Sequence, residues 1–160
     1  MAYHDDLLRQ ALYLVHKEPR NPKQASLRRG VSTAYYALFH LLIGEAVANW
    51  NVVSLRAALG RAFDHGIMKA ASNRIQDTRQ FSFTGEDPGV VAALRAVAKT
   101  FAQLQEKRHI ADYDNTTFWT RTEALTQVKS AEQAFNTWKS IRSELIAQAY
   151  LVSLAVKKRD

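Results

Sequence analysis

One arginine stands in this sequence where a buried apolar residue is expected. From residue 90 onward, apolar residues recur at steps of three and four and form one helical stripe: Val90, Leu94, Val97, Phe101 and Leu104. The next position on the stripe holds Arg108, whose guanidinium keeps its charge and is rarely buried without a partner. Either the helix end leaves the core at this residue, or the protein holds a cation in a cleft.

The residues after this arginine could take part in the same chemistry. The segment reads Arg-His-Ile-Ala-Asp-Tyr-Asp from residue 108 to residue 114. Arg108 and Asp112 are four residues apart and could simply pair along a helix. Tyr113 lies about 140° around the helix from Arg108, but both could still flank one groove if the helix end frays. We expect His109 to face solvent or a partner, whereas Asp114 could accept a proton.

A second polar line is predicted on an earlier, largely apolar helix. The apolar stripe of that helix contains Leu27, Val31, Tyr35, Leu38 and Leu42. Arg29, Thr33, Tyr36 and His40 follow at steps of four, three and four and form a separate line. Such a line indicates an internal hydrogen-bond network or one wall of a cleft. The alternative is an exposed Arg29, a core Tyr36 and a His40 that donates to a carbonyl.

Helices are expected over most of the chain. The sequence has 6 glycines and 3 prolines in 160 residues, and strand-like alternation is hard to find. We expect helices at about 5–17, 26–48, 88–113 and 120–157, with a less regular insert at 49–87. The predicted fold is a single all-α domain over residues 1–160, an antiparallel bundle of four or five helices with long central and C-terminal helices.

The last of these helices is long for a globular protein. Its predicted stripe contains Val128, Ala131, Phe135, Trp138, Leu145, Ala149, Val152 and Val156. Either the helix breaks near Ser140, or its end, residues 140–160, extends and packs on another chain. This apolar end leads us to expect a homodimer.

Charge and cysteine content narrow the function classes. Lys plus Arg is 22 and Asp plus Glu is 15, giving a net charge of +7, which favours nucleic acid, nucleotide or anionic-surface partners. The cations are scattered, apart from the run Lys157-Lys158-Arg159.

The absence of cysteine excludes disulfides, thiolate metal sites and a cysteine nucleophile. No signal peptide and no run of about 18 apolar residues is found, so we expect a cytoplasmic protein without a membrane span. No metal-ligand spacing or cofactor motif is present.

Two segments together resemble the HEPN superfamily. They are the helix that reads Leu-Arg-Arg-Gly-Val-Ser-Thr-Ala-Tyr-Tyr-Ala-Leu-Phe-His from residue 27 and the run from residue 108 to residue 114. The resemblance covers residues 7 to 138. It implies a small all-helical domain, often dimeric, of the kind found in prokaryotic toxin–antitoxin, phage-defence and nucleotide-handling systems. Active ribonucleases of the superfamily carry an arginine and a histidine four to six residues apart and cleave RNA without metal, through the 2′-OH.

The resemblance assigns roles and also shows a departure. Arg108 matches the arginine, which would hold the scissile phosphate and stabilise the charged phosphorane. The histidine position falls on residues 113 to 115, which are Tyr, Asp and Asn. The adjacent His109 does not match. Proton transfer would then depend on His40 or Tyr113. In some toxin members, a partner nucleotidyltransferase modifies a tyrosine near the motif, a role that would fall on Tyr113.

Three hypotheses follow. The first is a dimeric, metal-independent endoribonuclease that uses Arg108 with His40 or Tyr113. The second is a catalytically inactive module of the same fold that binds RNA, a nucleotide or a partner protein. Its polar cleft would contain Arg29, Tyr36, His40, Arg108 and Asp112, with His109 and Asp114 nearby. The third is an interaction bundle in which Arg108 and Asp112 form a buried pair.

Overall fold

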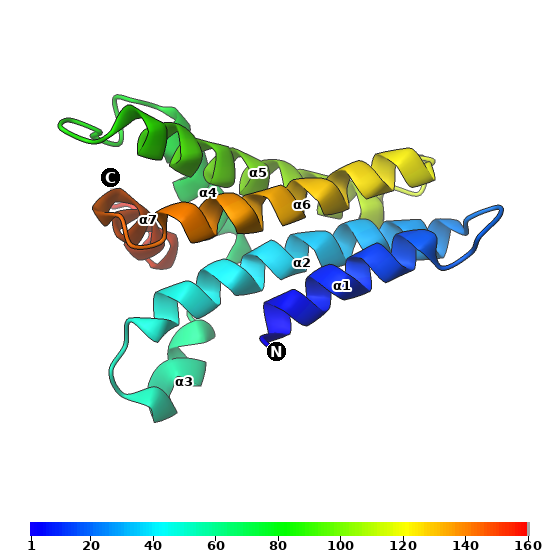
Figure 1. Ribbon diagram of the computed structural model, residues 1–160, viewed down its shortest axis with the longest axis horizontal. Coiled ribbons are helices and arrows are strands. Elements are labelled where there is room, and N and C mark those ends of the chain that lie inside the picture. The colour runs from blue at the N-terminus through cyan, green and yellow to red at the C-terminus, as the bar shows by residue number, and fades with distance from the viewer. Residues whose placement is uncertain (160) are drawn as a thin grey trace. The chain divides into compact units, whose positions relative to one another are not determined.

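A computed structural model describes residues 1–159, and over this range the chain forms seven α-helices and one short 3-10 helix (Figure 1). The α-helices are α1 (Tyr3–His16), α2 (Gln24–Ala48), α3 (Arg56–Gly60), α4 (His65–Gln76), α5 (Pro88–Tyr113), α6 (Arg121–Ile141) and α7 (Leu145–Ala155), and the 3-10 helix is η1 (Val53–Leu55). The all-α prediction is therefore confirmed. The segment expected to be less regular contains η1, α3 and α4 between loops.

The described residues group into two compact units. Unit 1 consists of residues 1–40 and 103–135, and unit 2 of residues 41–102 and 136–159. The helices α2, α5 and α6 each contribute residues to both units. That the chain forms a single domain therefore stays a prediction.

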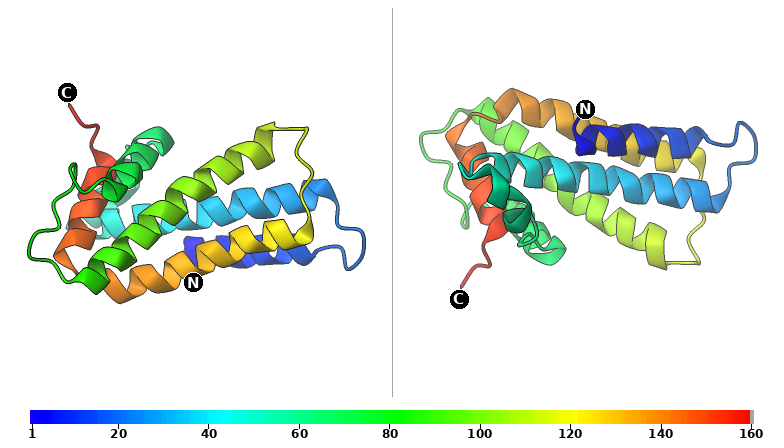
Figure 2. Two further views of the ribbon diagram at one scale, coloured as in Figure 1. Left: turned by 90° about the horizontal axis from the view of Figure 1, so that it is seen from above. Right: turned by 90° about the horizontal axis from the view of Figure 1, so that it is seen from below.

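Unit 1 contains α1, most of α2, the end of α5 and most of α6. Within it, α1 runs antiparallel to α2, as Figures 1 and 2 both show. The predicted stripe of α2 points into the core, because Leu27, Val31, Tyr35 and Leu38 are fully buried. They are joined there by Ala11 and Val15 of α1 and by Val128 and Phe135 of α6.

The start of α2 differs from the predicted one. The helix begins at Gln24, two residues before the expected start, and Ser26 lies inside it. The hydroxyl of Ser26 donates to Oε1 of Glu18 at 2.8 Å. Arg121 donates to the backbone carbonyls of Val15, Glu18 and Pro19, which fixes the chain between α1 and α2.

Unit 2 explains how the long C-terminal segment is divided. Helix α6 ends at Ile141, and α7 begins after the extended residue Glu144, so the break lies close to Ser140 as one of the two alternatives predicted. Helix α7 packs on α4, where the Tyr150 hydroxyl lies 2.6 Å from Ser72 Oγ. Burial raises the pKa of Tyr150 above its usual range, so it remains a neutral phenol.

The break corrects part of the predicted stripe. Leu145, Ala149, Val152 and Val156 are exposed, and the buried residues of α7 are Ile146, Ala147, Tyr150, Leu151 and Leu154. The predicted stripe runs through residues 142–144, which are not helical. Because this interruption changes the rotation of the following helix, a different face of that helix meets the core.

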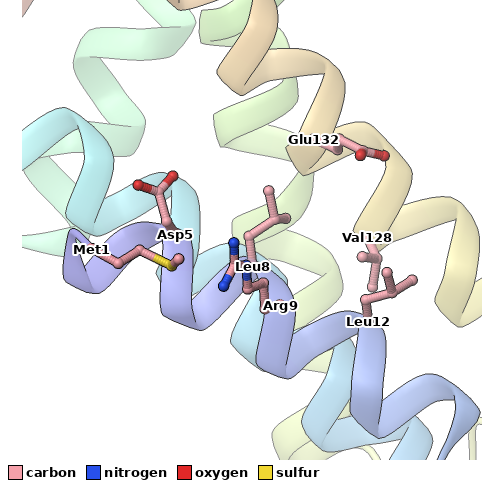
Figure 3. A pocket seen from close by; sticks show the side chains of 7 residues that line it. All are labelled: Met1, Asp5, Leu8, Arg9, Leu12, Val128 and Glu132. Atoms are coloured by element: carbon pink, nitrogen blue, oxygen red, sulfur yellow. The ribbon is translucent and has the colours of Figure 1, made fainter.

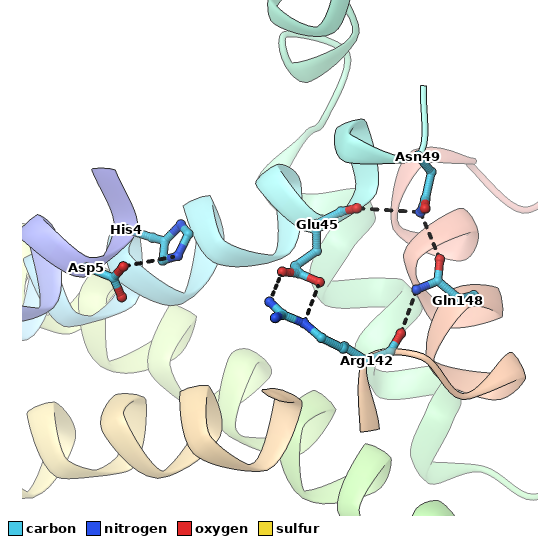
Figure 4. Close-up of polar contacts among 6 residues, drawn as sticks. All are labelled: His4, Asp5, Glu45, Asn49, Arg142 and Gln148. Carbon is cyan, nitrogen blue, oxygen red and sulfur yellow. Dashed lines mark hydrogen bonds and ion pairs between the residues drawn. The ribbon is translucent and has the colours of Figure 1, made fainter. Parts of the chain in front are cut away.

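Polar contacts join the turn and the first half of α7 to the end of α2 and the residue after it within unit 2. The Arg142 guanidinium pairs with the Glu45 carboxylate, and Asn49 Nδ2 donates to Gln148 Oε1 at 2.8 Å (Figure 4). The Gln148 amide in turn donates to the Arg142 carbonyl at 2.6 Å. These bonds satisfy polar groups where the chain reverses between α6 and α7.

Helix α2 is also long and apolar enough to cross a membrane by length and composition. The helix is 25 residues long, and half of its most apolar window is buried inside the protein. A core helix of a globular protein passes the same test, so this is weak evidence for a membrane span.

Two glycines of α2 provide a matched test of the packing between α1 and α2. A Cβ at Gly30 would lie 2.7 Å from Val15 Cγ2, whereas a Cβ at Gly44 meets no other atom within 4 Å. Gly44→Ala should raise the free energy of unfolding by about 0.5–1 kcal/mol through helix propensity. Gly30→Ala adds an overpacking penalty of about 1–3 kcal/mol that offsets this gain. Urea denaturation of the two variants should therefore separate them by at least about 1 kcal/mol, and equal stability would contradict the close approach at Gly30.

Candidate functional site

Arg108 is held as a largely buried cation in unit 1. Its side chain is 12% exposed, and Nη1 lies 3.7 Å from Oδ2 of Asp112, one helical turn later. The guanidinium carbon lies 5.3 Å from the ring centroid of Tyr35 and 5.8 Å from that of Tyr36. Both distances are in the range of cation–π contacts. Arg108 Nε is buried and has no hydrogen-bond partner. The stripe of α5 therefore ends on a cation that the protein encloses.

Asp112 links this cation to α2. Ser32 Oγ donates to Asp112 Oδ2 at 3.2 Å, the same oxygen that faces Arg108. The carboxylate is 18% exposed, so its pairing with Arg108 and Ser32 offsets part of the cost of removing it from water. The predicted i,i+4 pair is present, and it is part of a wider network with Ser32 and two tyrosine rings.

A groove of about 590 Å³ lies beside this network in unit 1. The lining residues are Ala25, Arg28, Arg29, Ser32 and Tyr36 from α2 and Ala111, Asp112 and Tyr113 from α5. Arg29 and Tyr113 are exposed, with 66% of the Tyr113 surface open to solvent. The groove is thus lined by two arginines, two tyrosines and one carboxylate, that of Asp112, which is already paired with Arg108 and Ser32.

Arg28 positions the α5 side of the groove, although its spacing in the sequence does not single it out. Its Nη1 donates to the carbonyls of Ala111 at 3.0 Å and Asp114 at 2.7 Å, and its Nη2 donates to the carbonyl of Thr117. The last carbonyls of a helix have no partner within the helix, and a cation there also favours the helix dipole. Arg28 therefore holds the end of α5, with Asp112 and Tyr113, against α2.

A second contact of the same kind fixes the loop after α5. The Gln24 amide donates to the Trp119 carbonyl at 2.7 Å and accepts from the Trp119 backbone N–H at 2.9 Å. In both cases the acceptors are backbone carbonyls far away in the sequence. A carbonyl belongs to every residue, so no sequence pattern predicts these contacts.

Asp114 serves the loop rather than the groove. Its carboxylate accepts from the backbone N–H of Thr116 at 2.8 Å and from the hydroxyls of Thr116 at 2.6 Å and Thr117 at 2.8 Å. These hydrogen bonds from Thr116, followed by those from Thr117, lower the pKa of Asp114 to about 2. The carboxylate stabilises the turn that follows α5 and does not line the groove.

The two candidate histidines lie outside the groove lining. The His40 ring contacts Tyr3, Tyr36 and Phe39, with centroid distances of 4.9, 6.5 and 5.2 Å. Tyr36 therefore touches both the His40 ring and the Arg108 guanidinium. His109 is exposed, and its ring lies 5.0 Å from that of Tyr113. Among the described residues that line the groove there is no imidazole.

Another hollow of about 300 Å³ lies between α1 and α6 of unit 1 (Figure 3). Leu12 of α1 and Val128 of α6 face each other there, and Leu8 adds to the apolar surface. Asp5 and Glu132 bring carboxylates from opposite helices, with Met1 and Arg9 also in the lining. This hollow combines a mostly apolar surface with mixed charges and carries none of the predicted site residues.

Comparison of the chain with protein-family models, curated proteins and solved structures finds no match. Within residues 1–159, no group of three or more His, Cys, Asp or Glu side chains is placed so that it could hold a metal ion.

The role of Arg28 can be tested by its loss. Because Arg28→Ala removes a charged donor from three carbonyls, it should lower the free energy of unfolding by about 2–4 kcal/mol. The neighbouring exposed Arg29→Ala is the matched control and should change stability by less than about 0.5 kcal/mol. Chemical denaturation measures both. Equal effects of the two substitutions would show that Arg28 does not hold α5.

The lowered pKa of Asp114 predicts a pH dependence. A carboxyl with a folded pKa below its unfolded value contributes stability above the unfolded pKa and loses it as pH falls through the folded pKa. The stability difference between the wild type and Asp114→Asn should thus be constant above about pH 5 and be lost progressively between about pH 5 and pH 1. Denaturation at a series of pH values checks this, and a difference that is as large at pH 2 as at pH 7 would contradict the proposed turn.

Proposed function

We propose that the groove of unit 1 binds single-stranded RNA. The observation that carries the proposal is the lining itself, in which the exposed Arg29 and the side chains of Tyr36 and Tyr113 face a groove of about 590 Å³. Single-strand binding sites combine cations that contact phosphates with aromatic rings on which bases stack. The net charge of +7 supports the same class of partner.

The pairing within the groove supports binding of an anion. Asp112 is the lining carboxylate, and Arg108 lies directly against it. With that pair mutually neutralised, Arg28 and Arg29 leave the groove with a net positive charge. The Arg29 side chain is exposed at the rim and is available to a phosphate, whereas Arg28 is already bound to three carbonyls.

Binding is better supported than cleavage. Metal-independent cleavage through the 2′-OH needs a group that accepts its proton, and an imidazole is the usual one. His40 and His109 are absent from the described groove lining, and a phenol is a poor general base at neutral pH. We therefore propose the inactive form of a HEPN-like module, acting in the cytoplasm in a prokaryotic toxin–antitoxin or defence setting. The resemblance of the two sequence segments supports that assignment.

Fluorescence anisotropy with a labelled single-stranded RNA tests the proposal. Arg29→Ala should weaken binding and reduce the slope of log affinity against log salt by about 0.7, the value for one phosphate contact on a single strand. Tyr113→Ala should weaken binding by about 1–3 kcal/mol with little change in that slope, since stacking is lost. Arg20→Ala, an exposed cation in the loop after α1, is the control and should bind as the wild type does.

If Arg20→Ala and Arg29→Ala weaken RNA binding equally, the RNA is attracted to the basic surface as a whole. The proposal that the groove is the binding site would then be wrong. Incubation of the same RNA with the protein tests cleavage separately. RNA fragments that disappear with Arg108→Lys, in a protein that remains folded, would show that the groove belongs to a ribonuclease.

A further inference from the structure

Helix α7 has apolar residues on two sides, and only one side is covered. One side packs within unit 2 through Ile146, Ala147, Tyr150, Leu151 and Leu154. The other consists of Leu145, Ala149, Val152 and, at the residue after the helix, Val156. Leu145 is 75% exposed, Val152 65% and Val156 57%. Helices that are apolar all round are normally buried on all sides, so the second stripe points to a partner.

The spacing of this exposed stripe is symmetric. Its members follow at steps of four, three and four, which keeps them within a sector of about 60° on the helix. The stripe reads the same in both directions about the point between Tyr150 and Leu151. If two copies pack antiparallel about that point, Leu145 meets Val156 of the second copy and Ala149 meets Val152 of the second copy. The small Ala149 allows the larger Val152 to fit against it.

Charge at the two ends favours the same arrangement. No charged residue lies between Leu145 and Ala155, so two copies can meet without burying an ion. Glu144 precedes the stripe, Lys157 follows it, and both are exposed. They are equally far from the midpoint along the sequence, so antiparallel packing brings Glu144 to the same end of the interface as Lys157 of the second copy. Parallel packing would instead place like charges together at both ends.

We propose that the chain forms a two-fold symmetric dimer through antiparallel packing of the exposed α7 stripe. The interface is isologous, since each copy offers the same patch. All of its residues belong to unit 2, whereas the RNA groove belongs to unit 1, so this dimer does not depend on the proposed function. An 11-residue helix is about 16 Å long, and two such helices bury less than the roughly 800 Å² per partner of a standard interface. The dimer is therefore weak and depends on concentration.

Sedimentation equilibrium of the full chain from about 1 µM to a few hundred micromolar tests the association. The wild type should shift from monomer to dimer over this range. Val152→Asp places two like charges at the centre of the interface and should raise the dissociation constant at least about tenfold. Phe118→Asp is the control, because Phe118 is 74% exposed in unit 1 and should leave the constant unchanged. Circular dichroism establishes that each variant is folded.

Cross-linking tests the direction of packing, because the chain has no cysteine of its own. Under mild oxidation, a mixture of Leu145→Cys chains and Val156→Cys chains should form mixed disulfide dimers, and neither variant alone should do so. As a second measurement, Glu144→Lys should weaken the dimer and Lys157→Glu in the same chain should restore it. A wild type that stays monomeric at a few hundred micromolar overturns the proposal, as does a dimer unaffected by Val152→Asp. Self-cross-linking of Leu145→Cys overturns the antiparallel register.

Discussion

A guanidinium that cannot lose its charge lies among the packed helices of unit 1, and its neighbours are arranged to compensate for it. Arg108 meets the Asp112 carboxylate on its own helix and the faces of Tyr35 and Tyr36 on α2. Removing one partner of a buried ion pair costs about 3–5 kcal/mol. The contact therefore constrains which faces of α2 and α5 meet, and it places Tyr36 and Asp112 together at the groove.

Arg28 performs a different task at the same end of α5. Its N–H groups donate to backbone carbonyls of the helix terminus and the following loop, so its hydrogen bonds stabilise the structure and its charge adds to the field of the groove. Its neighbour Arg29 points to solvent at the rim. Two adjacent arginines in one sequence motif thus have separate physical roles, because consecutive residues on a helix face directions about 100° apart.

The elements that depend on local periodicity could be predicted from the sequence. The stripe of α2 is fully buried at Leu27, Val31 and Tyr35, and α5 spans residues 88–113 as expected. The apolar stripe predicted for α7 was wrong, because residues 142–144 are not helical. The periodicity of α6 therefore does not determine which face of α7 is buried. In the site, the pairing of Arg108 with Asp112 followed from their spacing. The contacts of Arg28 and Gln24 with carbonyls 83 to 95 residues away did not, since any residue supplies a carbonyl.

The positions of the tryptophans have a practical consequence. Trp119 is the one tryptophan within residues 1–40 and 103–135, and it is 5% exposed. Trp138 is fully buried in unit 2, with its ring centroid 6.4 Å from that of Tyr150. Each unit thus contains a buried indole of its own. In variants that keep only Trp119 or only Trp138, tryptophan fluorescence would follow the unfolding of one unit at a time. The two signals would show whether the units unfold together or one after the other.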